Sequence, residues 1–92
     1  MSTVEAEREA MTANLVARHG SQLMAMIVIA DLVGEAAQAK HPELYTTYMS
    51  EMGRCIQARM RELGISNREY QAAGYEFYHA RALIAVLDEP PA

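Results

Sequence analysis

Tryptophan is absent from the sequence, and phenylalanine and cysteine each occur only once among its 92 residues. The single cysteine, Cys55, excludes an intramolecular disulfide, so burial of apolar side chains has to stabilise the fold. The first residues also lack the basic and then apolar pattern of a secretory signal peptide. We therefore expect a protein of the reducing cytoplasm.

Basic residues are scarce as well: eight lysines and arginines stand against twelve aspartates and glutamates, which gives a net charge of −4. A protein that binds the nucleic-acid backbone needs a basic face, so this balance argues against nucleic acid as the main partner. The chain has no glycine-rich phosphate loop after a strand, and no Ser–His–Asp or Cys–His arrangement with supporting context. We expect a protein that is not an enzyme and that binds no cofactor.

The most apolar segment is Leu23–Val33, in which Asp31 is the only polar residue. A helix that is apolar on all sides must be surrounded by other elements, so this segment predicts the central helix of a bundle. A membrane span takes about 20 apolar residues, and Asp31 and Glu35 interrupt the run before that length. The sequence therefore predicts a helical bundle with no membrane as partner.

Breaks in the hydrophobic pattern divide the chain into four helices. Gly20, Pro42 and Gly64 mark the breaks, Ser21 is expected to cap the second helix, and Ser66 opens a capping box at the fourth. Connections of two or three residues require neighbouring helices to run antiparallel. The sequence predicts an all-α fold, a compact antiparallel four-helix bundle forming one domain, with helices at about 3–18, 21–39, 42–63 and 66–87.

Two further patterns predict how the helices pack. A stripe of small residues on the first helix lets a neighbouring helix approach closely; its members are Ala6, Ala10, Ala13 and Ala17. On the third helix an apolar arc of about 140° includes Cys55, so we expect a buried, inert thiol there. Seven of the eight basic residues are arginines, which hints at ion pairs between helices.

The last helix has more apolar surface than one packing seam needs. Beside a core seam with alternating spacings of three and four residues, a second group lies further round the helix, Tyr75, Tyr78, Ala82 and Ala85, and Leu83 and Val86 add a third strip. Five of these side chains are candidates for a binding surface: Tyr75, Tyr78, Ala82, Leu83 and Val86. Tyrosine is enriched at protein–protein interfaces, and core packing is the alternative for the two tyrosines. We predict that these five residues form a partner-binding surface or a dimer interface.

Glu76 and His79 form a Glu-x-x-His pair, which is half of the ligand set of di-iron helical bundles. A complete metal site needs further carboxylates, and the candidates are Asp31 and Glu35 or a second copy of the chain. The alternative is a solvated strip beside the core. Asp31 itself is expected either to bind a neighbour such as Arg59 or to face a gap to solvent.

Three blocks of the chain keep a common order: Glu7-Arg8-Glu9 with Asn14–Ala17, then Val28–Asp31 with Val33, then Pro42-Glu43 with Thr47, Tyr48, Glu51 and Arg54. In that order they resemble the theta subunit of bacterial DNA polymerase III and its phage homologue, over residues 7–54. Gly20 interrupts what is a longer first helix in that family. Four extra residues lie before Pro42, and the whole fourth helix has no counterpart there. The resemblance implies an accessory protein that binds and steadies a proofreading exonuclease through residues 7–33.

The sequence thus predicts a non-enzymatic protein-interaction module that acts by binding another protein, as an accessory or inhibitor protein, and that forms a homodimer. Its small size and acidity also fit the inhibitors that phages encode against host machinery. The alternative from a different class is a small metal-binding bundle built on Glu76 and His79.

Overall fold

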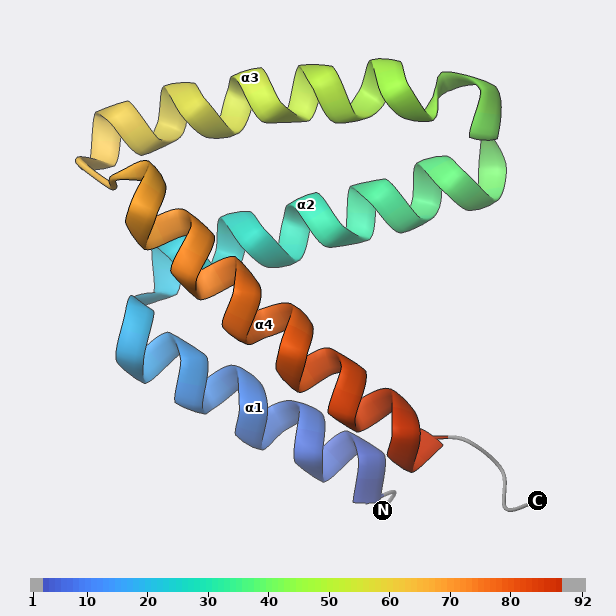
Figure 1. Ribbon diagram of the computed structural model, residues 1–92, viewed down its shortest axis with the longest axis vertical. Helices are drawn as coiled ribbons and strands as arrows, with labels where there is room; N and C mark the ends of the chain where they lie inside the picture. Colours follow the sequence, from blue (N-terminus) through green and yellow to red (C-terminus); the bar gives the residue numbers. More distant parts are fainter. Residues whose placement is uncertain (1–2, 89–92) are drawn as a thin grey trace.

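The computed structural model of the chain describes residues 3–88 (Figure 1). Its elements follow one another as α1 Thr3–His19, α2 Ser21–Lys40, the short 3-10 helix η1 Pro42–Leu44, α3 Tyr45–Leu63 and α4 Asn67–Asp88. Residues 3–88 contain no strand, so the predicted all-α fold is confirmed. The four α-helices pack into one helical bundle.

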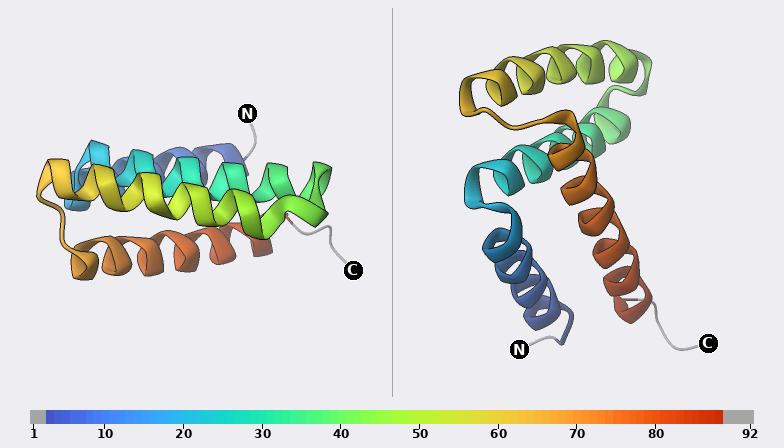
Figure 2. Two further views of the ribbon diagram at one scale, coloured as in Figure 1. Left: turned by 90° about the horizontal axis from the view of Figure 1, so that it is seen from above. Right: turned by 60° about the vertical axis from the view of Figure 1, so that its left-hand side comes forward.

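The helices form two antiparallel pairs. α1 packs along α4 and α2 packs along α3 (Figure 1), and α2 also contacts α1 and α4. Seen from above, α1, α2 and α3 lie in one layer, and α4 covers one face of that layer (Figure 2). α2 is therefore the central helix, as its apolar sequence predicts. In contrast, α3 packs only against α2 and η1 in the described part of the chain.

The breaks between helices lie where the sequence predicts them. Gly20 has φ 97° and Gly64 has φ 70°, values that glycine adopts without the steric cost of a Cβ. The Ser66 hydroxyl accepts a hydrogen bond of 3.1 Å from the Glu69 backbone N–H, which caps α4. The expected cap by Ser21 is wrong: Gly20 is the residue before α2, and no side chain caps that helix.

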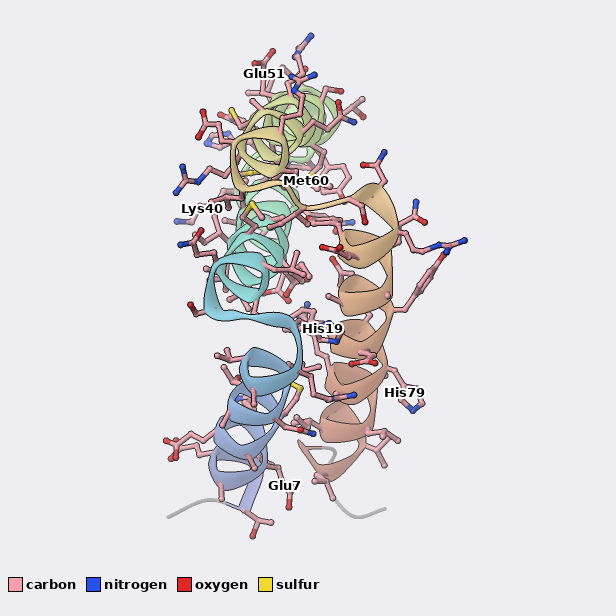
Figure 3. All side chains as sticks on the ribbon, turned by 90° about the vertical axis from the view of Figure 1, so that its left-hand side faces the viewer. Glu7, His19, Lys40, Glu51, Met60 and His79 are labelled. Carbon is pink, nitrogen blue, oxygen red and sulfur yellow. The ribbon has the colours of Figure 1, made fainter. Side chains whose placement is uncertain are left out.

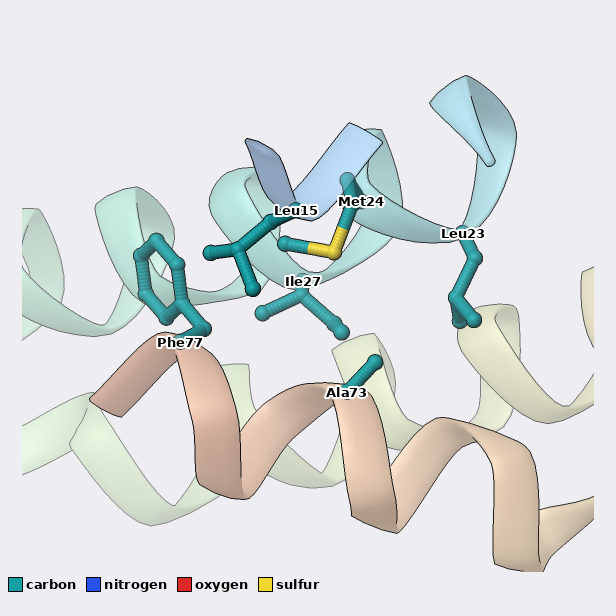
Figure 4. Packing of buried hydrophobic residues seen from close by; sticks show 6 residues of the cluster. All are labelled: Leu15, Leu23, Met24, Ile27, Ala73 and Phe77. Atoms are coloured by element: carbon teal, nitrogen blue, oxygen red, sulfur yellow. The ribbon is translucent and has the colours of Figure 1, made fainter. Parts of the chain in front are cut away.

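The core lies where α1, α2 and α4 meet. Figure 4 shows its buried side chains interdigitating from the three helices: Leu15, Leu23, Met24, Ile27, Ala73 and Phe77. α4 thus contributes to the centre of the core although the resemblance to theta subunits does not extend to it. A second contact joins α2 to α3, where a Cβ on Gly34 would lie 3.4 Å from the Met49 sulfur. The absence of a side chain at Gly34 allows this close approach.

α2 is longer than its apolar run suggests. It has 20 residues and contains an 18-residue window of mean hydropathy 1.3, so by length and composition it matches a membrane-spanning helix. The helix is longer than the apolar run Leu23–Val33 because residues 21–22 and 34–40 extend it at both ends. The central helix of a bundle has the same composition, and contacts with all three other α-helices account for it here.

Two packing expectations are wrong, both because a helix face has no neighbour within the chain. Cys55 is exposed rather than buried, because α3 packs only against α2 and η1, which leaves Tyr45, Tyr48 and Cys55 of its apolar arc exposed. The alanine stripe of α1 buries against no helix within residues 3–88; its members Ala6, Ala10, Ala13 and Ala17 are exposed, and Ala10 lines a groove beside α4. α1 turns its opposite face, which carries Leu15, towards the core.

Candidate protein-binding surface

The outer face of α4 is apolar and exposed. Ala73, Phe77 and Ile84 define the buried side of this helix, and 100° per residue places the following side chains in the half of the helix that faces away from it, with Leu83 at the edge of that half: Ala72, Tyr75, His79, Ala82, Leu83 and Val86. Tyr75 is 77% exposed, Val86 64% and Leu83 59%. His79 points away from the other helices (Figure 3). We call these six residues the α4 outer face.

No charged side chain lies on the α4 outer face. Between Gln71 and Leu87 the helix has only two charged residues, Glu76 and Arg81, and both bind other helices of the chain. Glu76 pairs with α1 and Arg81 with α2. These two charges therefore fasten α4 to the bundle, and from Ala72 to Val86 its outward side has no Asp, Glu, Lys or Arg; the exposed Arg68 lies on the same side, one turn before Ala72.

Glu76 holds α4 against α1. Its Oε2 atom accepts a hydrogen bond of 2.7 Å from Nε2 of His19 and lies 2.9 Å from Nη1 of Arg18. The hydrogen bond from His19, and then the positive charge of Arg18, lower the pKa of Glu76 against the opposing effect of its partial desolvation. The carboxylate of the Glu-x-x-His pair is thus engaged between helices, while His79 is exposed.

The structure adds no third ligand to the Glu76 and His79 pair. Within residues 3–88 no three His, Cys, Asp or Glu side chains are grouped closely enough to hold a metal ion. Asp31 and Glu35, the carboxylates expected to complete such a site, both bind Arg81 instead.

Arg81 is the link between α4 and α2 that the sequence analysis missed. Its Nη1 donates a hydrogen bond to Oδ2 of Asp31, and its Nη2 pairs with Oε1 of Glu35 one turn further along α2. The expected partner of Asp31 was Arg59, which instead pairs with Glu62 on the surface of α3 at 2.8 Å. The excess of arginine over lysine was the available signal that such interhelical pairs exist.

Tyr78 lies at the border of the α4 outer face rather than at its centre. It is 52% exposed, and its ring packs edge-on against Phe77 with centroids 5.4 Å apart. Burial raises its pKa, and the neighbouring Asp31 and Tyr45 raise it further. Of the five predicted surface residues, Tyr75, Ala82 and Val86 lie on the outward side. Leu83 lies at its edge, where it lines a groove beside α1, and Tyr78 turns towards α2 and α3.

A groove opens between α1, α2 and α4. It has a volume of about 660 Å³ and apolar walls that include Met11, Val28, Leu32 and Ile84, with Arg81 and its two carboxylate partners beside them.

Comparison with protein-family models, curated proteins and solved structures found no match to the chain. The chemistry of these surfaces is therefore the basis for a proposed function.

Proposed function

We propose that the chain is a non-enzymatic protein-interaction module of the cytoplasm, homodimeric, which binds another protein through the α4 outer face. One observation carries the proposal: this face is uncharged over its whole length while Tyr75, Leu83 and Val86 are each more than half exposed. Contiguous exposed apolar surface on a small protein typically marks a binding site. The free, exposed Cys55 is compatible with a reducing compartment.

The composition of the surface fits a partner protein. Tyrosine is enriched at interfaces because its ring buries a large area while its hydroxyl stays hydrogen-bonded. Tyr75 lies on the midline of the face, and Ala82 and Val86 follow about two and three turns further along the helix. Together they form an apolar strip against which a helix or sheet of a partner packs. The resemblance to theta subunits would place the partner contacts on residues 7–33 instead, that is, on α1 and the first part of α2.

The test compares partner capture by two variants. A tagged wild-type chain is expected to retain one stoichiometric partner from an extract of its native host, identified by mass spectrometry. Tyr75→Gln with Val86→Gln should lose that partner, because two central interface side chains of this kind together contribute about 100-fold in affinity. Circular dichroism should show unchanged helix content, since both side chains are exposed.

Tyr48→Gln is the matched control, because Tyr48 is an exposed tyrosine on α3, away from the α4 outer face. It should retain the partner. Equal capture by the wild type and the α4 double variant would refute the proposal. If the partner retained in that case were a proofreading exonuclease, the theta-like alternative would take its place.

A further inference from the structure

The exposed side of α2 carries a second apolar stripe, distinct from the α4 outer face. Its residues recur at spacings of four, three, four and three: Ala25, Ile29, Leu32, Ala36 and Ala39, all exposed. The two large members are at its middle, where Ile29 is 53% and Leu32 56% exposed. This is the spacing of a seam between two packed helices, but α1, α3 and α4 all contact other sides of α2. We call these five residues the α2 stripe.

The α2 stripe carries no charge. The two acidic residues of α2, Asp31 and Glu35, bind Arg81 of α4, and Lys40 is the last residue of the helix. Each chain has a net charge of −4, so two copies repel at long range, and a contact surface without like charges adds nothing to that repulsion. The α2 stripe provides such a surface, made entirely of aliphatic side chains.

We propose that the α2 stripe is the seam of a homodimer in which α2 of a second copy packs against it antiparallel. A two-fold interface presents the same patch from both partners. With the axis midway between Ile29 and Leu32, Ile29 of each copy faces Leu32 of the other, and Ala25 faces Ala36. Large side chains then meet at the centre, and the alanines on either side allow close approach of the two helices.

The surroundings of the stripe favour a second copy over a different protein. Obligate homodimer interfaces are more apolar than transient ones, and the α2 stripe is purely aliphatic, whereas the α4 outer face includes tyrosine and histidine. Leu32 also lines the groove between α1, α2 and α4, whose walls combine apolar side chains such as Met11 and Val28 with Arg8 and the Arg81 ion pairs. The seam rests on the homodimer of the proposed function but not on the partner-binding role of α4.

The first experiment measures the mass of the full chain in solution by light scattering during size exclusion, over a range of micromolar concentrations. The wild type should have twice its chain mass of 10.2 kDa. Ile29→Gln with Leu32→Gln should be monomeric, with the dimer dissociation constant raised about 100-fold or more. Its helix content should be unchanged, since both side chains are largely exposed. Tyr75→Gln with Val86→Gln is the matched control and should remain dimeric.

A wild-type monomer at every concentration, or an Ile29/Leu32 variant that is still dimeric, would overturn the seam. A dimer that is lost only in the Tyr75/Val86 variant would show that the α4 outer face is the self-association surface, and would overturn the partner-binding proposal too. A Tyr75/Val86 variant that loses partner capture but stays dimeric would agree with both proposals. The failures of the two proposals are therefore distinguishable.

Cross-linking tests the antiparallel direction, in chains whose Cys55 is replaced by serine. A mixture of Ala25→Cys and Ala36→Cys chains should form a disulfide between the two kinds of chain. Ala25→Cys alone should not, because positions 25 of the two copies then lie roughly 16 Å apart along the seam at 1.5 Å per residue, beyond the about 7 Å between Cα atoms that a disulfide spans. A disulfide formed by Ala25→Cys alone would instead indicate a parallel pair and refute the antiparallel seam.

Discussion

Replacing Arg81 by methionine should destabilise the bundle far more than the position of this residue near the surface suggests. The guanidinium holds Asp31 in the middle of the apolar helix α2, where that carboxylate is only 13% exposed. Methionine retains most of the aliphatic length of the side chain and removes the charge and the donors. The substitution therefore removes the guanidinium that is hydrogen-bonded to Asp31 in a largely apolar setting.

The magnitude follows from the exposure of the two partners. Breaking a fully buried pair from one side costs about 3–5 kcal/mol, and losing an exposed pair costs about 0.2–1 kcal/mol. Arg81 is partly exposed and Asp31 is nearly buried, so we expect Arg81→Met to lower the free energy of unfolding by about 2 kcal/mol. For a slope of about 1–2 kcal/mol per molar urea, the unfolding midpoint falls by about 1–2 M.

Urea unfolding followed by circular dichroism measures this effect, and Arg59→Met is its control. Arg59 and Glu62 form a pair at 2.8 Å whose two side chains are both largely exposed, so its loss should cost less than about 0.5 kcal/mol. Asp31→Leu combined with Arg81→Met should recover most of the lost stability, because replacing both members of a buried pair by apolar residues is often neutral. Equal midpoints for the Arg81 and Arg59 variants would refute the reasoning.

Two glycine substitutions should change the stability in opposite directions, and the stability should also depend on pH through Glu76. Gly74→Ala should stabilise α4 by about 0.5–1 kcal/mol, since nothing lies within 4 Å of the added Cβ; Gly64→Ala, at φ 70°, should lower the melting temperature instead. The pKa of Glu76 is lowered in the folded chain, so its ionised carboxylate adds to the free energy of unfolding. This contribution is complete above the unfolded pKa of about 4.5 and is lost as pH falls through the folded pKa. Urea midpoints from pH 3 to 7 should therefore fall at the acid end, less steeply in Glu76→Gln, and parallel profiles would contradict this.

Helix positions were predictable because local signals determine them. Glycines at positive φ interrupt the chain at Gly20 and Gly64, Pro42 opens η1, and the hydroxyl of Ser66 caps α4. Each of these signals acts within a few residues and needs no knowledge of tertiary packing. The uniform apolarity of α2 likewise predicted that this helix is central.

Interhelical contacts were less predictable because they depend on how the two helix pairs are arranged. The sequence predicts which faces of α3 and α1 are apolar or small, but not that α3 packs on α2 alone, leaving Cys55 exposed. In the same way, Asp31 had several arginines within plausible reach, and only the course of α4 over α2 brings Arg81 to it. Exposure of Tyr75 and Val86 was predicted, because α4 has more apolar surface than one seam covers.

The packing of α3 has a consequence for the order in which parts of the molecule open. Met60 is the only buried side chain of α3, and the backbone of this helix packs against α2 and η1 but not against α1 or α4. Local opening of a segment costs little where few apolar contacts hold it. Backbone amides of α3 should therefore exchange with solvent through detachment of this helix alone, while those near Leu15, Ile27 and Phe77 exchange only when the whole bundle unfolds. The protein thus has two levels of cooperativity within a single small bundle.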